Sequence, residues 1–157
     1  MPGIVGAAYA LNLATEQRTS EAPRLVALRD KLIEGVLSIP RTRLTGHPTH
    51  RLPNSASFVI EGIEGESLLL NLDLVGIAAS SGSACTSGDI EPSHVLTAMG
   101  YSASEARGSL RLTLGHSTEE VDIQTVLQHL PDIVGRLRSF ATRPAPRPDP
   151  QASVGKA

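Results

Sequence analysis

Residues 108–115 read GSLRLTLG, and this stretch decides the fold class. Its leucines alternate with Ser109, Arg111 and Thr113, which is the pattern of a strand with one face in the core and the other toward solvent. The alternation predicts a half-buried strand from Ser109 to Leu114. It also puts Arg111 on the face opposite the leucines.

Outward from this strand, strand-like runs and helical patterns alternate along the chain. Capping-box spacing of Ser102 with Glu105, and of Ser117 with Glu120, indicates two helix starts. The order of elements predicts an α+β fold in which a small, mainly antiparallel sheet is covered by helices on one face. Strands are expected at 41–46, 55–60 and 75–79, the last of them buried, and helices at 4–18, 20–37, 65–72, 91–99 and 120–140, with a kink or break at Pro131 in the last helix.

The composition along the chain indicates three segments. Residues 1–19 form a helix that is apolar around most of its circumference, and such a helix needs cover from protein on nearly every side. We interpret it as a helix lying between two bodies, followed by a small α+β domain over residues 20–140. Residues 141–157 hold four prolines and almost nothing to bury, which is typical of a disordered tail.

The overall composition fits one soluble domain. The chain has 157 residues, 40% hydrophobic and 19% charged, and about 100–200 residues per domain is typical. Fourteen basic and 16 acidic residues give a net charge of −2, so no basic excess favours a nucleic-acid partner. No apolar run approaches the ~18–20 residues that span a bilayer and no signal peptide opens the chain, so we expect a cytoplasmic protein without a membrane partner. The single cysteine excludes an internal disulfide framework and a multi-cysteine metal site, and we expect no metal.

That cysteine, Cys85, lies in the run ASSGSACTSG at 79–88, between two glycines. A free cysteine is usually buried and inert on a strand or helix face. A loop of glycine and serine instead favours an exposed thiol that travels to a reaction partner. From the residues alone, the two interpretations are evenly balanced.

Two motifs around Cys85 resemble the cysteine desulfurases, which are pyridoxal-phosphate enzymes of the class V aminotransferase fold. SSGSACTS at 80–87, followed by EPSHVL at 91–96, is similar to the active-cysteine loop of that family. GSLRLTLG at 108–115 is similar to the strand that follows the loop, at a matching separation.

Two further motifs resemble the same family, in the same order. PGIVG at 2–6 is similar to the start of its interdomain helix, and RLPN at 51–54 to the start of a strand in its small domain. The resemblance extends from Pro2 to about Phe140. It implies the small C-terminal domain of a fold-type-I, class V aminotransferase-like enzyme.

The resemblance also implies a chemistry, with L-cysteine as substrate. Pyridoxal 5'-phosphate is the electron sink, and the Cys85 thiolate attacks the substrate sulfur, leaving a persulfide on Cys85 and releasing L-alanine. Arg111 corresponds to the arginine that binds the substrate carboxylate, because a planar guanidinium makes two parallel hydrogen bonds to a carboxylate. Without the resemblance, Arg111 reads as a surface arginine on a half-exposed strand. The persulfide sulfur is expected to pass to a sulfur acceptor or an iron–sulfur scaffold protein.

The histidines carry weaker signals. His47 and His50 form a His-x-x-His pair, which without a neighbouring cysteine or carboxylate is more typical of solvated loop histidines than of a metal site. His94 follows the cysteine run and is placed either to set the protonation of the thiol or to lie exposed on its helix. A Cys–His hydrolase built on Cys85 lacks an acyl-enzyme motif.

Most of the resembled enzyme has no counterpart in this chain. The Schiff-base lysine of the family lies in its large domain, whereas the two lysines here, Lys31 and Lys156, lie on the polar side of a helix and in the tail. We therefore expect the chain alone neither to hold pyridoxal phosphate tightly nor to turn over cysteine. Met1 stands where the family pattern has a valine, so we also expect that translation was assigned from an internal valine codon or that the gene is interrupted upstream.

Three hypotheses follow from the sequence. The first is the C-terminal part of a cysteine desulfurase, completed by the missing large domain or by a homodimer partner. The second is a free-standing sulfur-relay or interaction module that acts with a separate large-domain chain. The third is a decayed gene product, which predicts exposed apolar surface and aggregation.

Overall fold

The computed structural model describes residues 1–81 and 92–141. Its elements in chain order are α1 (Pro2–Leu37), β1 (Thr42–Leu44), β2 (Ser55–Ile60), α2 (Gly65–Asp73), α3 (His94–Ala98), α4 (Ala103–Arg107), β3 (Ser109–Thr113) and α5 (Glu120–Ala141). The tail predicted over residues 141–157 lies, apart from Ala141, outside the described residues.

The three strands form one antiparallel sheet in the order β1-β2-β3. All three lie within runs that the sequence predicts as strands. In the central strand, Phe58 pairs with Leu44 of β1 on one side and Leu110 of β3 on the other. The α+β class with an antiparallel sheet is confirmed.

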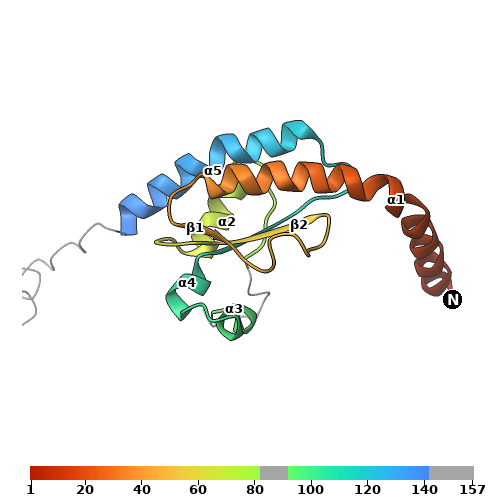
Figure 1. Ribbon diagram of the computed structural model, residues 1–157, viewed down its shortest axis with the longest axis horizontal. Coiled ribbons are helices and arrows are strands. Elements are labelled where there is room, and N and C mark those ends of the chain that lie inside the picture. Colours follow the sequence, from red (N-terminus) through yellow and green to blue (C-terminus); the bar gives the residue numbers. More distant parts are fainter. Residues whose placement is uncertain (82–91, 142–157) are drawn as a thin grey trace, which may run out of the picture.

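The main core lies between one face of the sheet and helices α1, α2 and α5 (Figure 1). Alternate residues of a strand share a face, and the residues of β2 and β3 that face these helices are buried. The helices contribute leucines and valines at three- and four-residue spacing. The fully buried side chains of this core include Phe58, Ile60, Leu110, Leu32, Val36, Leu68, Leu72, Leu130 and Val134.

The expectation that helices cover only one face was wrong. Val59 lies on the opposite face of β2 and is completely buried against Leu96 of α3 and Ala106 of α4. Tyr101 packs at the edge of this second cluster. Figure 1 shows the two short helices on the side of the sheet away from α5.

The predicted separation of the first two helices was also wrong. One helix of 36 residues runs from Pro2 to Leu37, with Pro23 inside it. A proline in a helix interior removes one backbone hydrogen bond and bends the helix without necessarily ending it. Figure 1 shows such a bend in the first half of α1. Helix α5 likewise continues through Pro131 without a break.

The segment 75–79 was predicted as a buried strand, and that prediction was wrong. Gly76 has a φ of +77°, a conformation that favours glycine, so the chain turns there. The backbone N–H of Ile77 then donates to the carbonyl of Leu72 at 2.9 Å, which folds the segment back onto the end of α2. Ile77 of this segment is buried in the core, and Ala79 packs against the core while partly exposed.

The two predicted capping boxes have different outcomes. In the box at α4, the Ser102 hydroxyl accepts from the Glu105 N–H at 3.3 Å and the Glu105 carboxylate accepts from the Ser102 N–H at 2.7 Å, as predicted. At the start of α5, the Glu120 carboxylate instead accepts from Lys31 Nζ, and the N–H of Glu119 donates to Asp122 at 2.9 Å.

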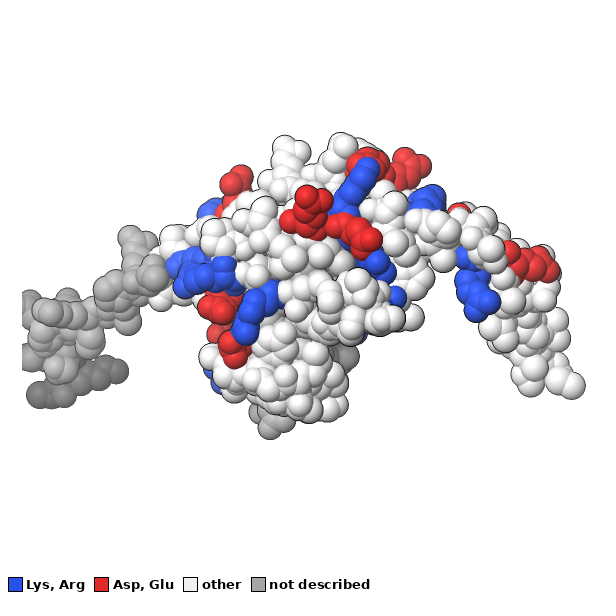
Figure 2. All heavy atoms as spheres, in the orientation of Figure 1, with Lys and Arg blue, Asp and Glu red and all other residues white. Residues whose placement is uncertain are grey.

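The first 20 residues form an arm that projects from the body of the protein (Figure 1). Every one of them is exposed, including Ile4 at 72%, Tyr9 at 71% and Leu11 at 70% of their full accessible surface. Figure 2 shows the end of this N-terminal arm (residues 1–20) as a surface without charges, because residues 1–15 contain no charged side chain. The first 15 residues of the arm are therefore uncharged, and the whole arm is uncovered in this chain.

Candidate functional site

Arg111 lies where the alternation of β3 predicts. Its side chain is exposed, whereas Leu110 and Leu112 on either side of it are buried. On one side of β3, the backbone of Arg111 pairs with Ser57 of β2. The guanidinium therefore projects from a strand whose position is fixed by the core beneath it.

On its other side, Arg111 pairs with Ser80. The Arg111 N–H donates to the Ser80 carbonyl at 2.6 Å, and the Ser80 N–H donates to the Arg111 carbonyl at 3.0 Å. This antiparallel bridge extends the sheet by one residue beyond β3. The chain therefore leaves the sheet beside Arg111 and continues, five residues later in sequence, to Cys85. Cys85 itself, and the predicted cysteine loop 80–88 from residue 82 onward, lie outside the described residues.

After residue 91, the chain resumes in a segment that is held to the sheet. Ser93 is buried directly before α3, and His94 is the first, exposed residue of that helix. From β1, the Arg43 guanidinium pairs with Glu105 of α4 and lies 5.0 Å from the ring centre of Tyr101. These contacts tie α3 and α4 to the edge of the sheet.

The carboxyl group of Glu105 is the best-connected acid of this region. Hydrogen bonds from the Ser102 hydroxyl and the Ser102 backbone N–H, with a smaller contribution from Arg43, hold the pKa of Glu105 below its ordinary value. The charged form is thereby favoured at neutral pH. Its role is structural, since it caps α4 and accepts from Arg43 of β1.

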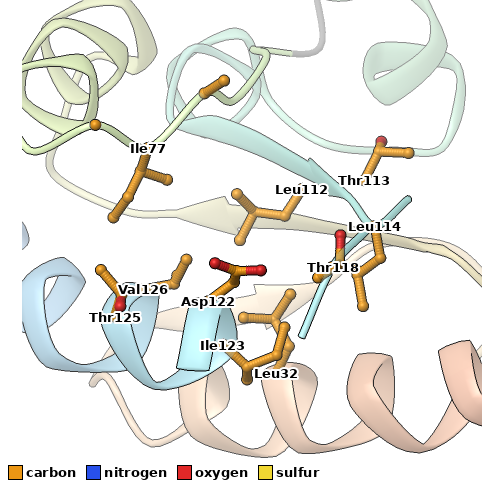
Figure 3. A pocket seen from close by; sticks show the side chains of 12 residues that line it. Leu32, Ile77, Leu112, Thr113, Leu114, Thr118, Asp122, Ile123, Thr125 and Val126 are labelled. Carbon is orange, nitrogen blue, oxygen red and sulfur yellow. The ribbon is translucent and has the colours of Figure 1, made fainter. Parts of the chain in front are cut away.

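A cavity of about 230 Å³ lies between α1, β3 and the start of α5 (Figure 3). Its floor is apolar, with Leu32, Leu112 and Ile123 among the lining side chains, and threonines and the carboxylate of Asp122 border it. Asp122 is its one charged lining residue among the described part of the chain. Because a carboxylate repels a phosphate, this cavity does not suit pyridoxal phosphate.

Lys31, the lysine within the described residues, is not placed to form a Schiff base with pyridoxal phosphate. Lys31 Nζ donates to both carboxylate oxygens of Glu120, at 2.8 and 2.7 Å, on the exposed side of α1. It does not line the cavity between α1, β3 and α5. Lys156 lies outside the described residues. The residues that the structure describes therefore provide no Schiff-base site for pyridoxal phosphate.

His47 and His50 lie in a turn that the His47 side chain stabilises by hydrogen bonds. His47 Nδ1 accepts from the backbone N–H groups of Thr49 and His50, at 3.1 and 2.9 Å. The two imidazole rings meet edge to face, with centres 4.6 Å apart. Among residues 1–81 and 92–141, no three histidine, cysteine or acidic side chains gather as metal ligands.

The sequence analysis missed a buried arginine. Arg29, within the helix predicted at 20–37, is only 5% exposed. Its guanidinium donates to the Leu52 carbonyl at 2.9 Å and to Asp30 at 2.7 Å, which binds the RLPN motif to α1. Neighbouring Arg51 donates to the Thr45 carbonyl, and burial together with the charge of Arg29 lowers the pKa of Arg51. Nothing in the helical spacing of Arg29 distinguishes it from an exposed arginine.

Residues 1–126 match the model of the aminotransferase class-V family. The chain belongs to that family. Its sequence is 51% identical over 141 residues to the cysteine desulfurase IscS of Methanosarcina thermophila, covering 90% of this chain and 35% of that protein. It is 47% identical over 139 residues to the cysteine desulfurase NifS of Azotobacter vinelandii, covering 88% of this chain and 35% of the other.

Solved structures agree with the sequence comparison. A NifS-like protein superimposes with a TM-score of 0.74 at 30% identity, over 87% of this chain and 34% of that one. A NifS-like protein from Rickettsia africae gives a TM-score of 0.69 at 27% identity, over 78% of this chain and 31% of that one. The chain thus spans about a third of the length of the relatives it matches. No helix among the described residues is long and apolar enough to cross a membrane.

Proposed function

We propose that this chain is the C-terminal part of a cysteine desulfurase, in which Cys85 carries the persulfide and Arg111 binds the substrate carboxylate. The observation that carries the proposal is the backbone pairing of Ser80 with Arg111. Ser80 lies beside that arginine and precedes the single cysteine by five residues in the sequence. The sequence similarity to a cysteine desulfurase, 51% identity over an alignment that covers 90% of this chain, supports the proposal.

In the proposed reaction, the thiolate of Cys85 attacks the sulfur of L-cysteine. A sulfur–sulfur bond forms, the carbon–sulfur bond of the substrate breaks, and the carbon takes up the proton of the substrate thiol to give L-alanine. The products balance without an external oxidant. The nucleophile must be the thiolate, and the planar guanidinium of Arg111 suits a carboxylate better than a lysine does. Pyridoxal phosphate, as the electron sink, belongs to the remainder of the enzyme, and the chain alone is inactive.

The same proposal assigns a place to each segment. Residues 1–19 lie between this domain and the large domain, residues 20–140 form the small domain with the cysteine loop at 80–88, and residues 141–157 form a tail. The enzyme works in the cytoplasm and passes sulfur to an acceptor or an iron–sulfur scaffold protein. A large domain, in the same polypeptide or in a homodimer partner, completes the site.

The test joins this chain to the large domain of a similar enzyme. In the cysteine desulfurase of Methanosarcina thermophila, the region that aligns with this chain is replaced by residues 1–157. We expect the chimera to release L-alanine from L-cysteine and to carry a persulfide on Cys85. The Cys85→Ser variant should lose both signals, whereas Gln128→Ala, on the exposed side of α5, should keep both.

Two results would refute the proposal. One is a persulfide that is still labelled in the Cys85→Ser chimera. The other is a chimera that folds and binds pyridoxal phosphate, by circular dichroism and absorbance, but does not release alanine.

A sulfur-relay module that works with a separate large-domain chain is the second candidate. One observation favours it: side chains of α1, α2, α5 and the sheet form one continuous hydrophobic core within this chain. The mass of the native protein, captured from its source cell with an antibody, separates the candidates. A species of 16.5 kDa favours the relay module, and a species more than twice as large favours the complete desulfurase.

A further inference from the structure

Helix α1 bends in its first half, where the N-terminal arm leaves the body (Figure 1), and Pro23 lies inside this helix. Proline has no N–H, so the helical hydrogen bond from residue 23 to the carbonyl of Thr19 is missing. Residues 1–20 of this helix are all exposed, whereas Glu21 and Ala22 are half-buried. With this hydrogen bond missing, the backbone of α1 restrains the orientation of the arm relative to the rest of the helix less strongly at Pro23.

Arg24 replaces the missing restraint with contacts to a different part of the chain. Its guanidinium donates to the carbonyl of Thr118 at 2.6 Å and to the carbonyl of His116 at 2.9 Å. It also donates to the carboxylate of Glu21 at 2.8 Å, one turn earlier in α1. One planar group thus connects the two sides of Pro23 to the loop after β3.

Glu21 connects to the same loop. Its Oε2 lies 3.2 Å from His116 Nδ1 as well as 2.8 Å from Arg24. The hydrogen bond from Arg24, followed by the contact with His116, lowers the pKa of Glu21, so its carboxylate is charged at neutral pH. We call Glu21, Arg24 and His116, with the carbonyl groups of residues 116 and 118, the joint.

The loop in the joint is itself rigidly attached to β3. The Gly115 N–H donates to the Thr118 hydroxyl at 2.8 Å, which closes the loop on itself. The Leu114 N–H donates to the Asn54 carbonyl at 2.8 Å, directly before β2. Three residues separate Arg111 from Gly115, so the joint is continuous with the strand that carries Arg111.

We propose that the joint fixes the direction of the N-terminal arm relative to β3, with Arg24 as the positioning residue. A body that packs on the arm is thereby held in a defined orientation to Arg111. The consequence for catalysis rests on the proposed function, in which that body is the large domain. The joint itself exists in this chain and is testable without any enzymatic activity.

The test measures the distance between two spin labels in the full chain. In a Cys85→Ser background, labels are attached through Tyr9→Cys on the arm and Gln128→Cys on α5, both at exposed positions. We expect one narrow distance distribution for the parent and, for Arg24→Ala, a distribution about twofold broader or more, because several arm directions become populated. Arg24→Lys, which keeps the charge but loses the planar fork, should fall between them.

The matched control is Lys31→Ala, which removes an ion pair from the same helix, away from Pro23. The helical signal in circular dichroism should stay the same in all variants, which separates loss of direction from loss of folding. Equal widths for Arg24→Ala and Lys31→Ala would overturn the joint. The spin-label experiment measures no activity, so its failure would not refute the proposed desulfurase function. Conversely, an inactive chimera would not refute the role of the joint.

Discussion

Arg111 combines two requirements of a substrate-binding arginine: an exposed guanidinium and a backbone held from both sides. Its carbonyl and N–H groups pair with Ser80, and β2 lies on its other side. Under the proposed function, the strand would therefore not need to reorganise for the side chain to bind a carboxylate, which would limit the entropy lost on binding.

In the chimera, Arg111→Ala should lower kcat/KM for L-cysteine by about 10²-fold or more, because removal of one partner of a buried charge pair costs roughly 2–5 kcal/mol. Arg111→Lys should recover only part of the loss, since it cannot bind in a bidentate manner. Arg136→Ala on α5 serves as the control for loss of an arginine. Equal values of kcat/KM in Arg111→Ala and Arg136→Ala would show that Arg111 does not bind the substrate.

Gly108 occupies a position without room for a side chain. A Cβ there would lie 2.1 Å from the carbonyl oxygen of Ile60, which is a backbone atom. The Ile60 N–H donates to the Gly108 carbonyl at 2.8 Å, so the two segments cannot separate without losing this bond. The close approach places β3 against the end of β2.

Gly108→Ala should therefore destabilise the fold by about 3 kcal/mol, at the upper end of overpacking costs. Gly135→Ala is the matched control, because nothing lies within 4 Å of its Cβ in α5. That change should stabilise the helix by roughly 0.5–1 kcal/mol. Urea unfolding followed by circular dichroism measures both, and a neutral Gly108→Ala would contradict the steric argument.

At the scale of single elements, α4 depends on its capping box because it is only five residues long. Its charged cap, Glu105, also accepts from Arg43 and so connects α4 to β1. Since folding lowers the pKa of Glu105, the charged carboxylate contributes stability at neutral pH. That contribution is lost as the pH falls below about 4.3, the ordinary value for glutamate, toward the lower pKa of the folded state.

Glu105→Gln tests this contribution, because glutamine keeps the hydrogen bond from the Ser102 N–H but has no titrating charge. We expect its unfolding free energy to fall less steeply than that of the parent as the pH is lowered from about 5 to about 3. Glu34→Gln removes an exposed carboxylate of α1 as a comparison. A pH dependence altered to the same extent in both variants would argue against a special role for Glu105.

At the scale of the whole molecule, the dominant feature is an apolar arm beside a body with its own core. Exposed apolar patches of this kind promote association. The arm contributes no buried side chain to the core, whose first member in the chain is Leu28.

Deletion of residues 1–18 should therefore leave the unfolding midpoint of the body in urea nearly unchanged while reducing self-association. Analytical ultracentrifugation at increasing protein concentration measures the association, and circular dichroism measures the midpoint. As a control, Leu32→Ala, in the buried half of the same helix, should cost about 2–5 kcal/mol. A deletion that destabilises the body as much as Leu32→Ala would show that the arm is part of the folded unit.

Local patterns in the sequence predicted the three strands of the sheet, the exposed position of Arg111 and the capping box of α4, but also a strand at 75–79 that does not form. These features depend on local rules, namely alternation in a strand and the fixed spacing of a helical turn, which act over a few residues. The motifs around Cys85 and Arg111 likewise led to the class V aminotransferase family without any structural information.

Only the tertiary structure decided how the elements meet. Pro23 and Pro131 fall inside continuous helices because packing and distant hydrogen bonds outweigh the local cost of a proline. Arg29 is buried because carbonyl oxygens from another segment accept its protons. The pairing of Ser80 with Arg111 and the contacts of Arg24 with residues 116–118 join segments 31 and more than 90 residues apart. No local pattern encodes such contacts, because they depend on where the folded core places each backbone group.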